Sequence, residues 1–352
     1  MHGKSARFVR LRSILVMAAL LGSVGGLNAQ GQPAVEATSS KVHAGLYEIS
    51  SSTADGSIWV AAVGSRAVEG ARLIALDPVT LEERRVIDMG DAAAFGVAIN
   101  NRTQTLYTTN TRAGNMSAVN LETGEVTIIE RPGVEGAPHM YRVVVDEANN
   151  RVYATAADTP GSIWVVDGAT NTLERVIENV GAQTTGLVLD AEANRLYASN
   201  LSDNEIAVID LATFQVINKI PTQGERSTQL AFDPATKRLF VGNQGTNDIS
   251  VIDVSTGELL RKVPAGTQPV GVAFHPGTSR IYVAARGDGA LTVIDGTTYE
   301  RVADVEVGTF PNTIHIDSTS GKVYVTNKAR RAPRDQPNAV DPNGDIVTVL
   351  RP

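Results

Sequence analysis

The sequence predicts an all-β fold, a seven-bladed β-propeller with four-stranded blades, and three observations lead to it. One aromatic side chain recurs seven times, at intervals of 48, 46, 44, 43, 42 and 42 residues. Each aromatic lies in a short run whose apolar residues alternate at a period of two, which indicates strands. A repeat of about 40–50 residues with four strands is typical of a propeller blade. The aromatics are Trp59, Tyr107, Tyr153, Tyr197, Phe240, Tyr282 and Tyr324.

Alignment of the repeats on the aromatic defines the four strands of each unit. The first is short, apolar and often Gly-rich, as in GVAIN and GVAFH, so we expect it to line the crowded axis. The aromatic run is the second strand. Runs such as IAVID form the third, and a turn such as VSTGE leads to the fourth.

The aromatic column is interpreted as core between neighbouring blades, because burying an aromatic ring stabilises a fold by a few kcal/mol. The acids that end the third strands are interpreted as turn caps, since Asp accepts hydrogen bonds from the backbone two residues on. They stand one per blade around a ring and cannot share one metal ion. They are Asp77, Asp167, Asp210, Asp253 and Asp295, with Asn120 in the same place.

The seventh unit lacks a fourth strand, because its third strand, Ile346–Leu350, ends two residues before the C-terminus. An unpaired sheet edge invites aggregation. Ala34–Val42 is the spare segment that can complete this sheet. The sequence therefore predicts a ring closed by an N-terminal strand, residues 34–42, in the last blade.

The first 29 residues have the pattern of a secretory signal peptide: a basic start, the apolar stretch Ile14–Val24 and a small-residue cleavage site after Ala29. We therefore expect a periplasmic or secreted protein, 30–352 as a single propeller, and no membrane insertion after cleavage. The alternative is an uncleaved anchor. Removal of residues 1–29 leaves 27 basic and 38 acidic residues, a formal net charge of −11. This charge argues against general duplex-DNA binding through a basic surface.

Two columns of residues open the first strands on one face of the predicted ring. The nearer column holds Glu48, Gly96, Arg142, Gly186, Gln229, Gly271 and Thr313. The preceding column holds Tyr47, Phe95, Tyr141, Thr185, Thr228, Val270 and Asn312. Its three aromatics are either a stacking platform for bases, sugars or an aromatic partner, or wedges between blade tops. Arg142 either pairs with Glu48 across the mouth or binds an anion, since a buried unpaired guanidinium is costly.

A polar insertion, residues 328–345, separates the last two strands of blade seven. It is rich in Pro and basic residues and is either a functional face loop or a solvated, disordered segment. Together with the face columns it supplies the candidate ligand-binding residues. These are Tyr47, Phe95, Tyr141, Arg142, Arg226, Asn312, Lys328, Arg330 and Arg331.

Catalytic and cofactor signatures are weak. The chain has no cysteine, which excludes disulfides, thiolate metal sites and covalent haem attachment. No two histidines have metal-ligand spacing, and His315 is interpreted as a core residue. DPNGD at 341–345 and Arg286-Gly287-Asp288 are interpreted as ordinary turns. We expect no catalytic residue, no metal and no cofactor.

The run Tyr324-Val325-Thr326-Asn327 is the motif that names the YVTN-repeat β-propeller family, and the chain resembles that family. ALDPVTLE, FGVAINNRTQTLYTTN, SIWVVDG and TTGLVLDAEANRLYASN are more narrowly similar to its periplasmic YncE-type members. The resemblance runs from about Ala44 to the C-terminus. It implies a seven-bladed, non-catalytic, exported propeller, and an association with single-stranded DNA.

The sequence thus favours a binding module or scaffold with its site on the loop face. The candidate partners are single-stranded DNA, bound weakly, and a protein or peptide with no nucleic-acid role. The alternative is a lactonase-like propeller hydrolase, for which Glu48, Arg142 and His139 are the residues that gather near one spot.

Overall fold

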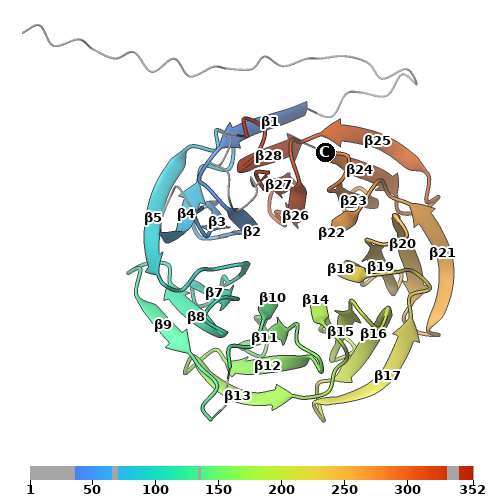
Figure 1. The fold of residues 1–352 in the computed structure, drawn as a ribbon, viewed down its shortest axis with the longest axis horizontal. Helices are drawn as coiled ribbons and strands as arrows, with labels where there is room; N and C mark the ends of the chain where they lie inside the picture. Colours follow the sequence, from blue (N-terminus) through green and yellow to red (C-terminus); the bar gives the residue numbers. More distant parts are fainter. Residues whose placement is uncertain (1–35, 66–69, 134–135, 331–340, 352) are drawn as a thin grey trace, which may run out of the picture.

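The computed structural model describes residues 36–65, 70–133, 136–330 and 341–351. The predicted signal peptide lies outside the described residues, as do Arg331 and most of the polar insertion. The described chain forms 28 strands in seven four-stranded antiparallel sheets, arranged around a central axis (Figure 1). The predicted seven-bladed propeller is therefore confirmed. No helix long and apolar enough to cross a bilayer occurs in this part of the chain.

Blades one to three follow the predicted order, with the first strand of each nearest the axis. Their strands are β2 Leu46–Ser51, β3 Ile58–Ala62, β4 Ala71–Leu76, β5 Glu83–Gly90, β6 Gly96–Asn100, β7 Thr105–Asn110, β8 Asn115–Asn120, β9 Val126–Ile129, β10 Met140–Asp146, β11 Arg151–Ala156, β12 Ser162–Asp167 and β13 Thr172–Ile177.

Blades four to six repeat this arrangement. Their strands are β14 Thr184–Asp190, β15 Arg195–Asn200, β16 Glu205–Asp210, β17 Gln215–Pro221, β18 Ser227–Asp233, β19 Arg238–Asn243, β20 Asp248–Asp253, β21 Glu258–Pro264, β22 Pro269–His275, β23 Arg280–Ala285, β24 Ala290–Asp295 and β25 Arg301–Glu306.

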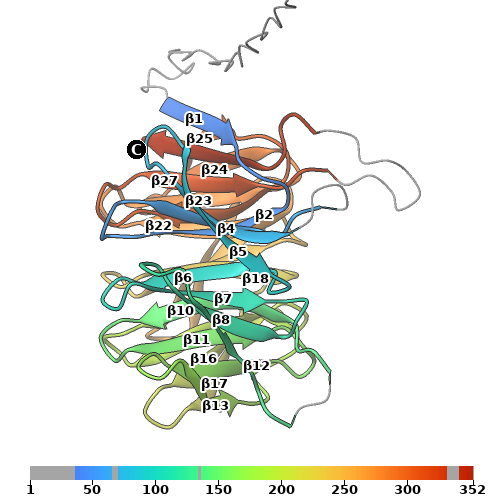
Figure 2. The ribbon, with the colours of Figure 1, turned by 90° about the vertical axis from the view of Figure 1, so that its left-hand side faces the viewer.

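Blade seven is built from both ends of the chain. It contains β26 Pro311–Ile316, β27 Val323–Asn327 and β28 Ile346–Arg351, and its outermost strand is β1 Glu36–Lys41. The β1 strand pairs antiparallel with β28 over its whole length, from Glu36 opposite Arg351 to Lys41 opposite Ile346. Figure 2 shows β1 at the edge of the ring in side view. The predicted closure is confirmed, with the strand itself spanning 36–41.

Each aromatic of the column is buried between its own blade and the next one, as predicted. None is more than 3% exposed. Tyr107 packs with Met140 and Val143 of blade three, and Tyr324 packs with Leu46 and Ile49 of blade one. The Tyr324 hydroxyl donates to the Pro78 carbonyl at 2.9 Å. The last blade is therefore joined to the first by the same packing of an aromatic ring against the next inner strand that joins the other blades.

The acid column caps turns, also as predicted. Asp77 Oδ1 accepts from the amides of Val79 and Thr80, both at 2.8 Å. These backbone hydrogen bonds and the Arg84 guanidinium overcome a small desolvation effect and lower the pKa of Asp77 to about 2. Asn120 makes the same pair of bonds in blade two.

Most first strands begin with a bulge, which explains the two face columns. In blade one, Leu46 pairs with Ala62 and Ile49 with Val60, so Tyr47 and Glu48 together oppose one residue. The same shift occurs at Tyr141–Arg142 and at Thr228–Gln229. A bulge redirects side chains and bends its strand. The bulges thereby bring Arg142 and Gln229, each from a different blade, within hydrogen-bond distance of Glu48.

Hydroxyl groups on several second strands connect these bulges from blade to blade. Thr109 Oγ1 accepts from the Gly96 amide of its own blade and donates to the Tyr141 carbonyl of the next at 2.6 Å. Thr155 does the same with Arg142 and Thr185. At the closure, Thr326 Oγ1 donates to the Tyr47 carbonyl at 2.6 Å. We use the name hydroxyl bridge for this type of hydrogen bond, from a threonine hydroxyl of one blade to the bulge carbonyl of the next.

His315 lies on β26, the inner strand of blade seven, where its Nε2 is 2.9 Å from Ser51 Oγ of blade one. Burial lowers the pKa of this imidazole to about 4, and the nearby Asp317 carboxylate offsets only part of that effect. The ring is therefore neutral at physiological pH and helps to join the first and last blades, which agrees with its interpretation as a core residue.

Deletion of residues 31–42 removes β1 and exposes the edge of β28. We expect the melting temperature to fall by several degrees and the protein to associate through the free edge. Thermal unfolding followed by fluorescence, together with size-exclusion chromatography, measures both effects. A matched deletion of residues 31–35, which leaves β1 intact, is the control. An unchanged melting temperature in a monomeric 31–42 deletion contradicts the role given to β1.

Replacement of His315 by Gln tests the neutral imidazole. Because the folded pKa of about 4 is below the ordinary value of 6.5, the wild type keeps its full stability above pH 6.5 and loses stability as the pH falls toward 4. Gln takes up no proton. Between pH 7 and pH 4.5 the wild type should lose about 2–3 kcal/mol more unfolding free energy than His315→Gln in urea titrations. Equal losses in both proteins would show that His315 is not held neutral.

Candidate functional site

An aromatic and cationic cluster borders the end of the central channel at which the inner strands begin. We call this end the mouth and define it by Tyr47, Phe95, Tyr141, Arg286 and Asn312. The rings of Tyr47 and Phe95 meet edge to face, with centroids 4.2 Å apart and planes at 63°. Both rings are partly buried against the core shared by blades one and two, so they do pack between blade tops.

Lys328 lies over the Tyr47 ring, its Nζ 3.2 Å from the ring centroid. This residue follows β27 directly, and its amide donates to the Phe310 carbonyl. A cation held over a tyrosine face is attracted by the ring quadrupole. The start of the polar insertion is thereby fixed beside the mouth, and one face of Tyr47 is occupied by an ammonium group.

Glu48 lies one residue deeper and accepts bonds from three other blades. Arg142 Nη1 donates to Glu48 Oε1 at 2.6 Å, and Gln229 Nε2 donates to the same oxygen at 3.4 Å. The Val97 amide donates to Oε2 at 3.2 Å. Glu48 is 5% exposed and Gln229 7%. Of the two readings left open for Arg142, the structure shows the ion pair across the channel.

Arg286 is a mouth residue that the sequence analysis missed, because Arg-Gly-Asp was interpreted as an ordinary turn. It follows β23 and reaches Asn312, whose Oδ1 accepts from Arg286 Nη2. Its Nε is buried without a hydrogen-bond acceptor among the described residues. Burial lowers the pKa of this guanidinium, while Tyr141 and Tyr47 act in the opposite direction. The sequence offers one indirect signal for Arg286: its hydrogen-bond partner, Asn312, stands in the second face column.

Tyr141 stands across the channel from Arg286, in blade three. Burial and the Glu48 carboxylate raise the pKa of its phenol, and Arg286 opposes that shift. The phenol therefore stays protonated at neutral pH and can donate a hydrogen bond. The His139 ring lies 6.3 Å from the Tyr141 ring, centroid to centroid.

The remaining candidates are Arg226, Arg330 and Arg331, and none of them has a contact with the rings of the cluster among the described residues. Arg226 is exposed and donates through Nε to Gln244 Oε1 at 3.2 Å. Arg330 lies over Phe310, 5.7 Å from the ring centroid, and Arg331 is not among the described residues. The structure thus brings together Tyr47, Phe95, Tyr141, Arg142, Asn312 and Lys328.

Two aspartates fix the ends of the polar insertion beside the mouth. Asp345 Oδ1 accepts from the amides of Gly45 and Ala329, at 2.9 and 3.3 Å. Asp341 Oδ2 accepts from the Arg330 amide at 2.9 Å. The segment 341–345, interpreted from sequence as a turn, therefore also connects the insertion to blades one and seven.

In chemical terms the mouth presents two cations, Arg286 and Lys328, next to phenol and phenyl rings. The deeper Glu48 carboxylate is already bonded by Arg142, Gln229 and the Val97 amide, which leaves it a poor general base. No group of three or more His, Cys, Asp or Glu side chains arranged to hold a metal ion occurs in the described parts of the chain.

Comparison with protein families and solved structures places the fold among known propellers. A family model described as "Lactonase, 7-bladed beta-propeller" matches residues 143–274. A structure of Kuenenia stuttgartiensis Hydrazine Synthase superposes with a TM-score of 0.69 at 16% identity, covering 82% of this chain and 94% of that one. At this identity the likeness concerns the fold alone.

Relatives at higher identity carry the name "Uncharacterized protein YncE". The chain is 36% identical over 213 residues to the Escherichia coli K12 protein, an alignment that covers 58% of this chain and 59% of the relative. It is 35% identical over 209 residues to the Salmonella typhi protein, covering 57% and 58%. The chain thus spans about three fifths of the length of the curated relatives it matches. These matches confirm the resemblance to YncE-type propellers that the sequence predicts.

Proposed function

We propose that the protein is an exported, non-catalytic binding module whose mouth takes single-stranded nucleic acid with modest affinity. The observation that carries this proposal is Arg286, a largely buried guanidinium that belongs to no ion pair found among the described residues and whose Nε has no acceptor. An uncompensated buried charge is costly unless a ligand completes its hydrogen bonds.

The charges around Arg286 favour an anion. Glu48 and Arg142 neutralise each other, with 2.6 Å between the paired atoms. Lys328 adds a second positive charge above Tyr47. A phosphate group at the mouth would accept hydrogen bonds from the guanidinium and from the Tyr141 phenol. Charge-assisted bonds of this kind are the strong ones in proteins.

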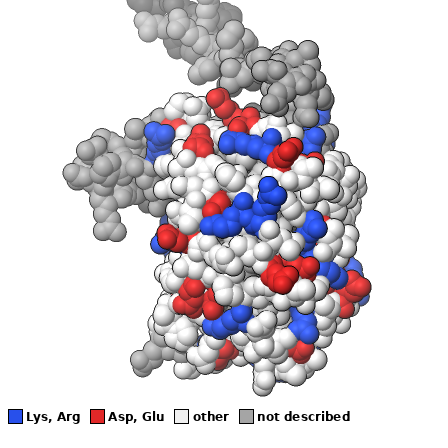
Figure 3. Space-filling model, turned by 90° about the vertical axis from the view of Figure 1, so that its right-hand side faces the viewer, with Lys and Arg blue, Asp and Glu red and all other residues white. Residues whose placement is uncertain are grey.

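The aromatic rings favour a ligand that also carries bases. Stacking on aromatic side chains is worth about 1–3 kcal/mol per base and tolerates any sequence. Phe95 and Tyr47, which are only partly buried, are the rings proposed to stack with the bases. The overall charge works against tight binding, and Figure 3 shows acidic and basic side chains intermixed on the flank of β21 and β25. We therefore expect dissociation constants of roughly micromolar or weaker at physiological salt.

The export part of the proposal rests on residues 1–29, whose pattern is that of a signal peptide. The alternative function is a hydrolase of the lactonase type, favoured by the family-model match over residues 143–274. For this alternative, Glu48 would have to leave Arg142 and act as a base, with His139, whose ring lies 6.3 Å from that of Tyr141, as the candidate imidazole. If the protein binds no oligonucleotide in the experiments below, a protein or peptide becomes the favoured partner.

Replacement of Arg286 by Gln should weaken binding of a fluorescein-labelled oligothymidylate about tenfold at low salt, because one phosphate contact is lost. The slope of log affinity against log salt should become shallower by about 0.7. Fluorescence anisotropy at several salt concentrations measures both. Arg261→Gln, an exposed change on the outer strand β21, removes the same charge and should leave the slope unchanged. No binding by the wild type at low salt removes nucleic acid from the proposal.

A Tyr47→Leu, Phe95→Leu double variant keeps apolar bulk against the core and removes both rings. We expect it to lose about 1–3 kcal/mol of binding free energy for each stacked base, equally for all sequences. The melting temperature, measured beside anisotropy, separates lost stacking from lost folding. Undiminished binding in a folded double variant would keep the ligand and discard the aromatic site.

A further inference from the structure

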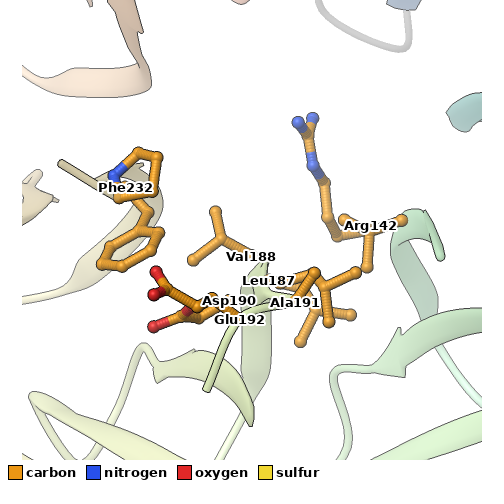
Figure 4. A pocket seen from close by; sticks show the side chains of 10 residues that line it. Arg142, Leu187, Val188, Asp190, Ala191, Glu192 and Phe232 are labelled. Atoms are coloured by element: carbon orange, nitrogen blue, oxygen red, sulfur yellow. The ribbon is translucent and has the colours of Figure 1, made fainter. Parts of the chain in front are cut away.

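A hollow lies away from the mouth, where the inner strands β14 and β18 end. It has a volume of about 480 Å³. Its walls are mostly apolar and include Val144, Val188, Phe232 and Pro234. Figure 4 shows the carboxylates of Asp190 and Glu192 pointing from the end of β14 toward Phe232. This site is independent of the function proposed for the mouth.

The repeat itself shows what is unusual about Asp190. An Asp ends the inner strand in blades three, four and five and directly follows it in blade seven. In three of these blades, the side chain three residues later donates to the carboxylate and completes its hydrogen bonds. The pairs are Asn149 Nδ2 with Asp146 Oδ2, Thr236 Oγ1 with Asp233 Oδ2, and Ser320 Oγ with Asp317 Oδ2.

Blade four has Ala193 at that place, and alanine has no side-chain donor. Asp190 Oδ1 accepts from the Ala193 amide at 3.1 Å. Its Oδ2 is buried and has no hydrogen bond among the described residues, and the side chain is only 2% exposed. An oxygen of this kind is costly to bury unless a donor reaches it. The departure from the repeat therefore coincides with the hollow.

Lys237 shows that an ammonium group fits beside this carboxylate. Its Nζ is 3.6 Å from Asp190 Oδ2, too far for a hydrogen bond, and 2.7 Å from Glu192 Oε2. It also lies 5.8 Å from the centroid of the Phe232 ring. Its ammonium is hydrogen-bonded to Glu192, which is exposed to solvent, so the buried Asp190 Oδ2 keeps no hydrogen-bond donor among the described residues. Arg142, which lines the inner end of the hollow, is paired with Glu48.

We propose that this hollow binds a primary ammonium group attached to an apolar or aromatic body. The ammonium donates to Asp190 Oδ2 and to Glu192, beside or in place of Lys237, and faces the Phe232 ring. The apolar body lies along Val188 and Val144, toward the channel axis. Arg142 at the inner end has only hydrogen-bond donors and offers an ammonium no acceptor, so the ligand enters with its ammonium near the outer rim.

The test uses 2-phenylethylammonium as the probe and its neutral analogue 2-phenylethanol as the comparison, with binding measured by calorimetry and by ligand-observed NMR. We expect the amine to bind and the alcohol to bind at least tenfold more weakly. Equal binding of both, or binding of neither, overturns the proposal.

Three variants locate the site. Ala193→Ser installs the donor that blade seven has and should weaken amine binding roughly tenfold while the melting temperature stays equal or rises. Lys237→Met removes the competing cation and should strengthen amine binding several-fold. Loss of amine binding in a folded Lys237→Met variant would overturn the placement, because Lys237 would then support the ligand rather than compete with it. Asp233→Asn removes the carboxylate that blade five has in place of Asp190 and is the control; an effect there equal to that of Ala193→Ser also overturns the assignment.

Discussion

The hydroxyl bridge is the interaction on which the geometry of the mouth depends. Thr109, Thr155 and Thr326 each donate to the bulge carbonyl of the following blade, and Thr326 does so across the closure. A bulge leaves backbone N–H or C=O groups without a hydrogen-bond partner on the neighbouring strand. When such a group is buried, it needs a hydrogen bond from elsewhere. The bridge supplies that partner and sets the spacing between blades. Tyr47, Tyr141 and their neighbours take their positions from it.

The channel has two chemically different ends, and the Glu48–Arg142 ion pair separates them. Above the pair, Arg286 and Lys328 stand among aromatic rings. Below it, apolar walls lead to Asp190 and Glu192. A buried ion pair contributes little net stability, although removing one partner is costly. Its position favours a role as a partition that keeps cationic and acidic regions apart within one narrow channel.

The repeat made most of the fold predictable, because each blade must bury an aromatic and cap a turn in the same way. The 42–48-residue spacing, the Asp column and the missing seventh-blade strand all follow from that rule. The site was predictable only in part. Tyr47 and Arg142 stand in aligned columns and were identified, whereas Arg286 sits in a loop where no column marks it. The orphan oxygen of Asp190 depends on which donors reach it, and that requires coordinates.

Closure by β1 also governs how the chain acquires its structure. Among the described strands, the first along the chain, residues 36–41, pairs with the last, residues 346–351. Contacts that join the two ends of a chain carry the largest loop-closure entropy, and folds rich in them form slowly. The six preceding blades can each assemble from local hairpins as they emerge. The ring can close only after β28 has been synthesised. Until then the growing chain is an open arc of sheets, each of which is only marginally stable alone.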